Sequence, residues 1–364
     1  MPSFVHTADL HLDTPFSARF TQRQAELRRQ EMLQTFQKIA QRAAKADLFF
    51  LSGDIFDSKS VSKDTIAFLK RCFADMPDTL VFIAAGNHDP LTENSVYRTV
   101  QWGENVHIFS AEMECVDLPQ WNLRVYGRSF QAEHESRPIP DVFAKKGNES
   151  NVLVLHGDVI SSGESVYGPV FKEDLAHSGL IYAALGHIHQ YSGIQRIGDT
   201  VYAYPGIPEG RGFDETGQKG FIAGEFSDGR VTAEWIPVNR RSFWEFSIDI
   251  SKTEDRVQIL EAVQNKIQEI GGAEDIFRVI LKGALDKGLI QTELLEEQLK
   301  DSAFYLKIVD QTRPAYSLQE LAKEPTLRGA FVRNMLKKID MMPQEEQEIG
   351  YLAIEIGLCA MEER

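Results

Sequence analysis

Five short apolar runs in the first half of the chain each end in residues that can bind metal ions. The clusters are Asp9-Leu10-His11, Gly53-Asp54-Ile55-Phe56-Asp57, Gly86-Asn87-His88-Asp89, His156-Gly157 and Gly186-His187-Ile188-His189. Runs of this length are typical of buried strands, and the carboxyl ends of parallel strands meet at one edge of an α/β sheet. The order of the clusters therefore predicts one site assembled from five strand ends.

The spacing of apolar residues predicts an α/β fold for residues 1–240. Buried strands are expected at 4–8, 47–51, 80–84, 152–155 and 180–185, with helices at 23–46 and 65–73. On the first helix, Arg28-Arg29 is expected to form a solvated face. Residues 191–237 change to β segments, and Asp228-Gly229 is a strong hairpin-turn signal. Together these segments predict a layered sheet sandwich with flanking helices.

A second, smaller domain is expected after a boundary near residues 237–242. Strands at 243–250, 277–281 and 304–309, with helices at 255–270 and 293–299, predict a small α/β domain over 241–312. The chain then becomes helical. Helices are expected at 318–323, 327–339 and 345–360, and they form a third region, 313–364.

Composition limits the classes of protein to which this chain can belong. The net charge of −15 argues against a simple DNA-coating protein, although bound cations and a local basic rim allow an acidic enzyme to act on DNA. Three scattered cysteines indicate neither a disulfide framework nor a cysteine zinc site. Neither a signal peptide nor an apolar stretch of roughly 18–20 residues is present. We therefore expect a reduced, cytoplasmic protein without a membrane span.

The clusters offer carboxylate, amide oxygen and imidazole, which are the ligands that hard and borderline divalent metals bind. Two such ions about 3.5–4 Å apart assist phosphodiester hydrolysis by activating water and neutralising phosphate charge. The expected ligands are Asp54 as the bridge, Asp9, His11 and His189 on one ion, and Asn87, His156 and His187 on the other. Manganese, magnesium, iron and zinc all accept these ligands, so the residues indicate two divalent cations without naming the metal.

Five further residues have predicted roles at this site. His88 is expected to bind neither metal and to act as the acid that protonates the leaving oxygen. Asp57 is expected to orient the His88 imidazole. Asp89 is a weaker candidate for such a supporting role. Among basic residues, Arg211 lies in a loop rich in glycine and proline and is the best candidate for a phosphate contact, with Arg128 as another.

The complete set of motifs resembles the calcineurin-like metallophosphoesterases. The opening His6-Thr7-Ala8-Asp9-Leu10-His11-Leu12-Asp13 and the Gly-Asp-Ile-Phe-Asp motif are similar to the DNA-repair exonuclease branch, the SbcD-type and YhaO-like proteins. Some archaeal and eukaryotic members differ by carrying histidine at the position of Asp57. The likeness covers residues 1–240, while 243–312 is similar in placement and pattern to the capping domain of these nucleases.

This resemblance implies a four-layer αββα sandwich with a DNA-binding capping domain. It implies manganese-dependent exonuclease and endonuclease cleavage of DNA in DNA repair, with two Mn²⁺ ions per chain. It also implies a homodimer and a partner ATPase of the SMC type with a long coiled coil. The helices of region 313–364 match the ATPase-docking segment by their position.

Three other functions are compatible with parts of this pattern. A small-molecule phosphodiesterase, such as a cyclic-nucleotide enzyme, would use the same metals, and the acidic charge favours it, whereas the added domain favours the nuclease. A protein phosphatase is disfavoured because Asp57 lacks the Arg-Gly continuation and Asn87-His88 is followed by Asp89 rather than Glu. A non-enzymatic scaffold is expected to have lost ligands, and none is lost.

Overall fold

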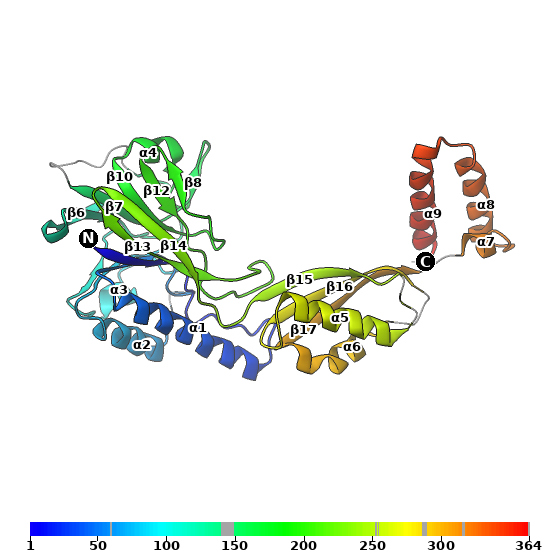
Figure 1. Ribbon diagram of the computed structural model, residues 1–364, viewed down its shortest axis with the longest axis horizontal. Helices are drawn as coiled ribbons and strands as arrows, with labels where there is room; N and C mark the ends of the chain where they lie inside the picture. Colours follow the sequence, from blue (N-terminus) through cyan, green and yellow to red (C-terminus); the bar gives the residue numbers. More distant parts are fainter. Residues whose placement is uncertain are drawn as a thin grey trace. The chain divides into compact units, whose positions relative to one another are not determined.

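The computed structural model describes residues 1–58, 60–139, 149–251, 253, 255–285, 290–314 and 317–362. The chain divides into two compact units, Met1–Phe243 and Trp244–Arg364, and each is described by itself (Figure 1). All five clusters lie in the first unit. Among the described residues, no helix combines the length and the apolar character needed to cross a membrane.

The first sheet of the first unit has six strands in the order β14-β13-β1-β2-β3-β4. Four neighbouring strands are parallel: β1 (Ser3–Thr7), β2 (Leu48–Ser52), β3 (Leu80–Ala84) and β4 (Val106–Ile108). The hairpin of β13 (Gly220–Ser227) and β14 (Arg230–Pro237) joins β1 in antiparallel pairing. Its turn residues Asp228 and Gly229 have φ values of 49° and 72°, which are the left-handed angles that a two-residue hairpin turn requires.

The second sheet also has six strands, in the order β11-β12-β10-β7-β6-β5. Its parallel strands are β6 (Leu123–Gly127), β7 (Ser150–His156), β10 (Leu180–Gly186) and β12 (Thr200–Ala203). The antiparallel edge strands are β5 (Glu114–Leu118) and β11 (Gln195–Ile197). A separate short pair consists of β8 (Val159–Ile160) and β9 (Val170–Phe171).

The two sheets enclose one core and carry helices on their outer sides. Alternate residues of a strand face opposite sides, so Phe50 points into the core between the sheets with Val154 and Tyr182. Its neighbour Phe49 points outward and stacks on Phe36 of α1, with ring centroids 6.2 Å apart.

Helices α1 (Gln22–Ala43) and α2 (Lys63–Ala74) lie beside the first sheet, and α4 (Lys172–His177) beside the second (Figure 1). A further short helix is α3 (Val96–Thr99). The predicted four-layer αββα architecture is therefore confirmed.

The second unit contains a three-stranded sheet in the order β15-β16-β17. Its elements are β15 (Phe243–Asp249), α5 (Arg256–Ile270), β16 (Ile276–Leu285), α6 (Thr292–Gln298) and β17 (Tyr305–Pro314). The helices α7 (Leu318–Leu321), α8 (Leu327–Ile339) and α9 (Gln347–Glu362) follow, and they share a small apolar core around Val332, Ile339 and Leu358. A role in capping or docking for either part stays a prediction.

The prediction of a solvated Arg28-Arg29 face is wrong for Arg28. This side chain is completely buried and donates to Glu31 at 2.7 Å and to Glu209 at 2.8 Å. Glu209 also accepts from the Thr35 hydroxyl at 2.9 Å and from the main-chain nitrogen of Arg240 at 2.7 Å. Arg28 is thus the centre of a buried ion network that joins α1 to the segment between β12 and β13.

We predict that Arg28→Ala lowers the free energy of unfolding by about 3–5 kcal/mol, because it leaves the buried carboxylate of Glu209 without its cation and leaves Glu31 with Arg241 alone. Arg29→Ala is the matched control, since Arg29 is the neighbouring arginine on α1 and its ion pair with Glu26 is largely exposed. Urea unfolding followed by circular dichroism measures both. Equal losses in the two variants would contradict the assignment of Arg28 to the network.

Candidate active site

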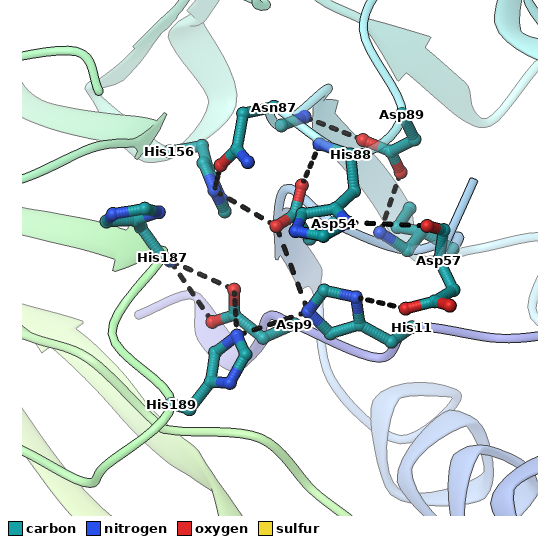
Figure 2. A network of polar contacts seen from close by, with 12 residues as sticks. Asp9, His11, Asp54, Asp57, Asn87, His88, Asp89, His156, His187 and His189 are labelled. Carbon is teal, nitrogen blue, oxygen red and sulfur yellow. Dashed lines mark hydrogen bonds and ion pairs between the residues drawn. The ribbon is translucent and has the colours of Figure 1, made fainter. Parts of the chain in front are cut away.

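The carboxyl ends of β1, β2 and β3 meet the carboxyl ends of β7 and β10 at one edge of the sandwich. Strand register aligns them: Thr7 pairs with Leu51, Ser52 with Ala84, and His156 with Gly186. All five predicted clusters therefore lie together (Figure 2). The carboxyl ends of parallel strands meet at one edge within each sheet, and the packing of the two sheets brings these two edges together.

Several residues at these strand ends adopt left-handed backbone angles that side chains disfavour. Asp9, His11, Asp54 and His187 have φ values of 54°, 44°, 50° and 105°. Hydrogen bonds hold this conformation, from the Asp9 nitrogen to Gly53 O at 3.0 Å and from the His11 nitrogen to Asp54 O at 2.9 Å. Strained angles of this kind persist where the surrounding structure fixes them, and they concentrate at functional sites.

Two glycines allow the strands to approach one another at the site. A Cβ atom on Gly53, whose φ is +89°, would lie 2.4 Å from Nδ1 of His156. A Cβ atom on Gly186 would lie 1.9 Å from the carbonyl oxygen of Ser52. Glycine at these positions therefore lets the two sheets bring their ligand-bearing ends into contact.

The first group of candidate ligands contains Asp9, His11 and His189, whose ligand atoms all lie within 4.8 Å of one another. The Nε2 atoms of His11 and His189 are 3.2 Å apart, and His189 Nε2 is 3.9 Å from Asp9 Oδ1. Figure 2 shows these side chains pointing toward a common centre. The arrangement brings together the three residues that the sequence assigns to one ion.

The second group is built around His156. Its Nε2 atom lies 3.4 Å from Asp54 Oδ2 and 3.0 Å from Asn87 Oδ1. The His187 ring centroid lies 5.2 Å from that of His156, and its Nε2 atom contacts Asp158 at 3.3 Å. Asp54 Oδ2 also lies 3.8 Å from His11 Nε2, so this oxygen stands between the two groups.

The donor set fits divalent cations in its charge as well as its ligand types. Asp9 and Asp54 are both buried, and burial raises the pKa of Asp9 to about 6 against the opposing charges of His156 and His189. Burial also lowers the pKa values of His11 and His187 to about 4, which keeps these imidazoles in the neutral form that binds metal. A cation between the carboxylates would offset the repulsion that their burial creates.

In the Asp54–His156 pair each residue shifts the pKa of the other. Burial by itself would lower the pKa of His156, but the charge and hydrogen bond of Asp54 raise it to about 9. The same contact lowers the pKa of Asp54, although burial acts in the opposite direction. Positive charge is therefore favoured beside Asp54 Oδ2, the oxygen that stands between the two groups.

His88 lies on the exposed side of the cluster, and Asp57 does not orient it in the expected way. The His88 main-chain nitrogen donates to Asp54 Oδ1 at 2.9 Å, while its Nδ1 lies 3.3 Å from the main-chain oxygen of Asp57. The Asp57 carboxylate is instead 3.2 Å from His11 Nδ1 and accepts from Arg211 at 2.9 Å. His88 and Asn87 line a cavity of about 510 Å³ together with Tyr167.

The two predicted phosphate-binding arginines have different surroundings. Arg211 lies at the site, where its guanidinium contacts Asp57 and Glu215. Arg128 is buried, and its guanidinium donates to the carbonyl oxygens of Arg137 and Pro138. Its donors hold the main chain of the 137–138 segment, so in this structure they are not directed at the site.

Comparison with known proteins identifies the family to which this arrangement belongs. The family model of the calcineurin-like phosphoesterases matches residues 2–191. The chain belongs to this family.

Similar proteins include YhaO of Bacillus subtilis (strain 168), an uncharacterised metallophosphoesterase that is 27% identical, with 90% of this chain and 86% of that protein covered. The DNA double-strand break repair protein Mre11 of Aeropyrum pernix is 24% identical over 82% of this chain and 77% of its own. Mre11 of Methanopyrus kandleri is 22% identical over 89% of this chain and 76% of its own. These relatives confirm the predicted resemblance to the DNA-repair branch of the phosphoesterases.

Phosphoesterases of this family use divalent metals. In this chain three carboxylates contact the candidate ligands or the loops that carry them, and two of these, Glu215 and Asp158, were not predicted from the sequence. Glu215 accepts from His189 Nδ1 at 2.7 Å, and Asp158 contacts His187. Asp89 accepts from the Ile55 nitrogen at 2.7 Å and from the Tyr97 hydroxyl at 2.6 Å. Asp89 was visible as a weak candidate beside Asn87, whereas Glu215 carries no motif that would have indicated its role.

We predict that Mn²⁺ at about 100 times its dissociation constant raises the free energy of unfolding by about 2.7 kcal/mol for each site it fills. Asp54→Asn should remove most of this gain, because it reduces the charge of the oxygen that stands between both ligand groups. Asp117→Asn, at an exposed carboxylate on β5, should keep the full gain. Thermal unfolding with and without Mn²⁺ or EDTA tests this, and an unchanged Mn²⁺ response of Asp54→Asn would refute the assignment.

Proposed function

We propose that the protein is a two-metal-dependent DNA nuclease with exonuclease and endonuclease activity that acts in DNA repair. The observation that carries this proposal is the position of Asp54 Oδ2 between two groups of candidate ligands, 3.8 Å from His11 and 3.4 Å from His156. A carboxylate in this position fits the bridge of a two-metal site, and His88 lies beside the site with its imidazole open to the cavity.

The proposed ligands divide between two divalent cations, with Mn²⁺ as the proposed metal. Asp54 would bridge them; Asp9, His11 and His189 would hold one, and Asn87, His156 and His187 the other. When bound, such ions activate water and neutralise charge on the phosphate. His88 would supply the proton to the leaving oxygen, because it is exposed and neither proposed ion uses it. Its ring lies beside the ligands, since ligand atoms of His11, Asp57 and His88 are within 4.8 Å of one another.

DNA is favoured as the substrate by the relatives and by the length of the likeness. Two similar proteins are DNA double-strand break repair proteins. Their alignments cover 82% and 89% of this chain, which is more than the 243 residues of the first unit can supply. The likeness to repair proteins therefore includes part of the second unit, where we place the DNA-binding cap.

A small-molecule phosphodiesterase is the second candidate, and one observation favours it. The cavity beside His88 holds about 510 Å³, which is within the range of small-ligand pockets. The net charge of −15 also disfavours a long polyanion over a small phosphodiester. Both candidates use the same ligands and His88, so the substrate assay separates them.

We further propose a cytoplasmic homodimer that works with an SMC-type coiled-coil ATPase docked on α9. Several apolar side chains of this helix are exposed, among them Ile349, Leu352 and Ile356. Their spacing of three and four residues forms one apolar stripe, which is the pattern by which a helix recognises a partner. The buried side of α9 is already occupied by Ile354 and Leu358, which pack against Val332 and Ile339.

We predict that purified protein with Mn²⁺ degrades linear duplex DNA, and that His88→Ala reduces the rate by about 10²–10⁴-fold through loss of the proton donor. Mn²⁺ binding should be unchanged, because His88 is not a proposed ligand. His177→Ala, at an exposed histidine on α4, is the matched control and should retain full activity. Rates come from gel assays on labelled DNA.

Two results of this assay would count against the nuclease. Hydrolysis of a cyclic nucleotide with DNA left intact would favour the small-molecule enzyme. Full DNA cleavage by His88→Ala would keep the nuclease and remove His88 from its proposed role.

The docking proposal has its own prediction. Ile356→Glu should weaken binding of an SMC-type ATPase by about tenfold or more, because a carboxylate replaces one apolar anchor of the interface. Lys323→Glu, at an exposed polar position next to α7, should bind normally. Co-purification and titration of the two proteins measure this. Normal binding by Ile356→Glu would exclude the stripe on α9 as the docking surface.

A further inference from the structure

His11 and His189 belong to opposite sheets, and each has a carboxylate beside its Nδ1 atom. Each turns its Nε2 atom toward the proposed metal site and its Nδ1 atom toward a carboxylate. Glu215 lies 2.7 Å from His189 Nδ1, and Asp57 lies 3.2 Å from His11 Nδ1, in a longer and less well directed contact. A metal-binding imidazole needs such an outer partner to fix its tautomer and ring orientation.

Arg211 joins these two carboxylates to each other. Its Nη1 donates to Asp57 Oδ1 at 2.9 Å, and its Nη2 donates to Glu215 Oε1 at 3.1 Å. The Arg211 main-chain nitrogen donates to the second Glu215 oxygen at 2.6 Å. We name this group the Asp57–Arg211–Glu215 bridge. With the 3.2 Å approach of the two Nε2 atoms, the bridge and the two histidines form a closed ring.

The charges of the bridge determine which histidine nitrogen carries the proton. Arg211 Nη2 also lies 3.3 Å from His189 Nδ1, but a guanidinium only donates. Because His189 Nδ1 donates its proton to Glu215, the Arg211 and His189 nitrogens are two donors close together. Both donate to Glu215 Oε1, and the negative charge of this carboxylate offsets their repulsion. The Nε2 lone pair of His189 is thereby left to face Asp9 and His11, where a cation would bind.

The bridge is attached to the buried core through the start of its own loop. Arg28 donates to Glu209 at 2.8 Å and to the carbonyl oxygen of Gly210 at 2.9 Å, next to Arg211. Arg28 and Glu209 are both buried. The position of the Arg211 backbone is therefore fixed by an ion network that belongs to the fold and not to a ligand.

We infer that Arg211 is a positioning residue, which holds Asp57 and Glu215 so that His11 and His189 present their Nε2 atoms to a divalent cation. This inference rests on the proposed metal site. It gives Arg211 a different task from the phosphate contact expected from the sequence, because its two terminal nitrogens already donate to carboxylates. It also gives Asp57 a task on His11 in place of His88.

The two tasks of Arg211 predict different changes in two measured constants. If it positions ligands, Arg211→Gln and Glu215→Gln each raise the dissociation constant for Mn²⁺ by about 10–100-fold. The Mn²⁺ dissociation constant of Arg211→Lys should lie between those of these two variants and the wild type, because one ammonium group cannot donate to both carboxylates with the geometry of a guanidinium. At saturating Mn²⁺ the KM for DNA is unchanged. Calorimetric or electron paramagnetic resonance titration with Mn²⁺ alone measures the first constant and needs no catalysis.

Matched controls are Arg29→Gln and Glu26→Gln, an exposed arginine–glutamate pair on α1, which should bind Mn²⁺ normally. An unchanged Mn²⁺ dissociation constant together with a raised KM for DNA in Arg211→Gln would overturn the inference and restore the phosphate contact. If Arg211→Gln does not fold, as judged by circular dichroism, Glu215→Gln decides on the same titration. Wild-type protein that binds Mn²⁺ but leaves DNA intact would refute the nuclease and leave this inference standing.

Discussion

The structure of the site depends on two carboxylates that are buried within reach of the same histidines. Asp9 and Asp54 lie at neighbouring strand ends and lack water to separate their charges, since both are buried. An arrangement of this kind costs free energy unless positive charge compensates it. The left-handed backbone at both residues adds to that cost. The fold therefore holds a group of side chains that is better suited to binding cations than to stabilising the sandwich.

Successive sets of contacts around the site hold these side chains in place despite that cost. The buried strands bring the ligands to one edge, and Gly53 and Gly186 let the two sheets touch there. The Asp57–Arg211–Glu215 bridge then orients two histidines from outside the ligand groups. Arg28 and Glu209 fix the loop that carries the bridge. Each set of contacts is harder to predict from the sequence than the set it supports, because its partners are farther apart along the chain.

The sequence predicted the parts of the molecule whose signals are local. The apolar run at 80–84 matches β3 (Leu80–Ala84), and the Asp-Gly pair matches the β13–β14 turn. The rule about parallel strands accounts for the clusters that share a sheet, while the packing of the two sheets brings the two sets together. No element was predicted between residues 90 and 150, where β5 (Glu114–Leu118) is an edge strand with charged residues and alternating exposure. Arg28 and Glu209, which are 181 residues apart, gave no local sign of their pairing.

The charges near the site, more than the net charge, bear on the proposed action of an acidic protein on DNA. Exposed charges farther away than about 8 Å are largely screened at physiological salt, so the total charge of −15 matters less than the charges at the site. When ionised, the six carboxylates of the site and the one guanidinium of Arg211 give a local charge of −5; the carboxylates are those of Asp9, Asp54, Asp57, Asp89, Asp158 and Glu215. Two divalent cations, as proposed, would reduce this to −1. On this argument the acidic cluster repels phosphate until the metals bind, and under the proposed function metal occupancy would control both the chemistry and the access of the phosphodiester.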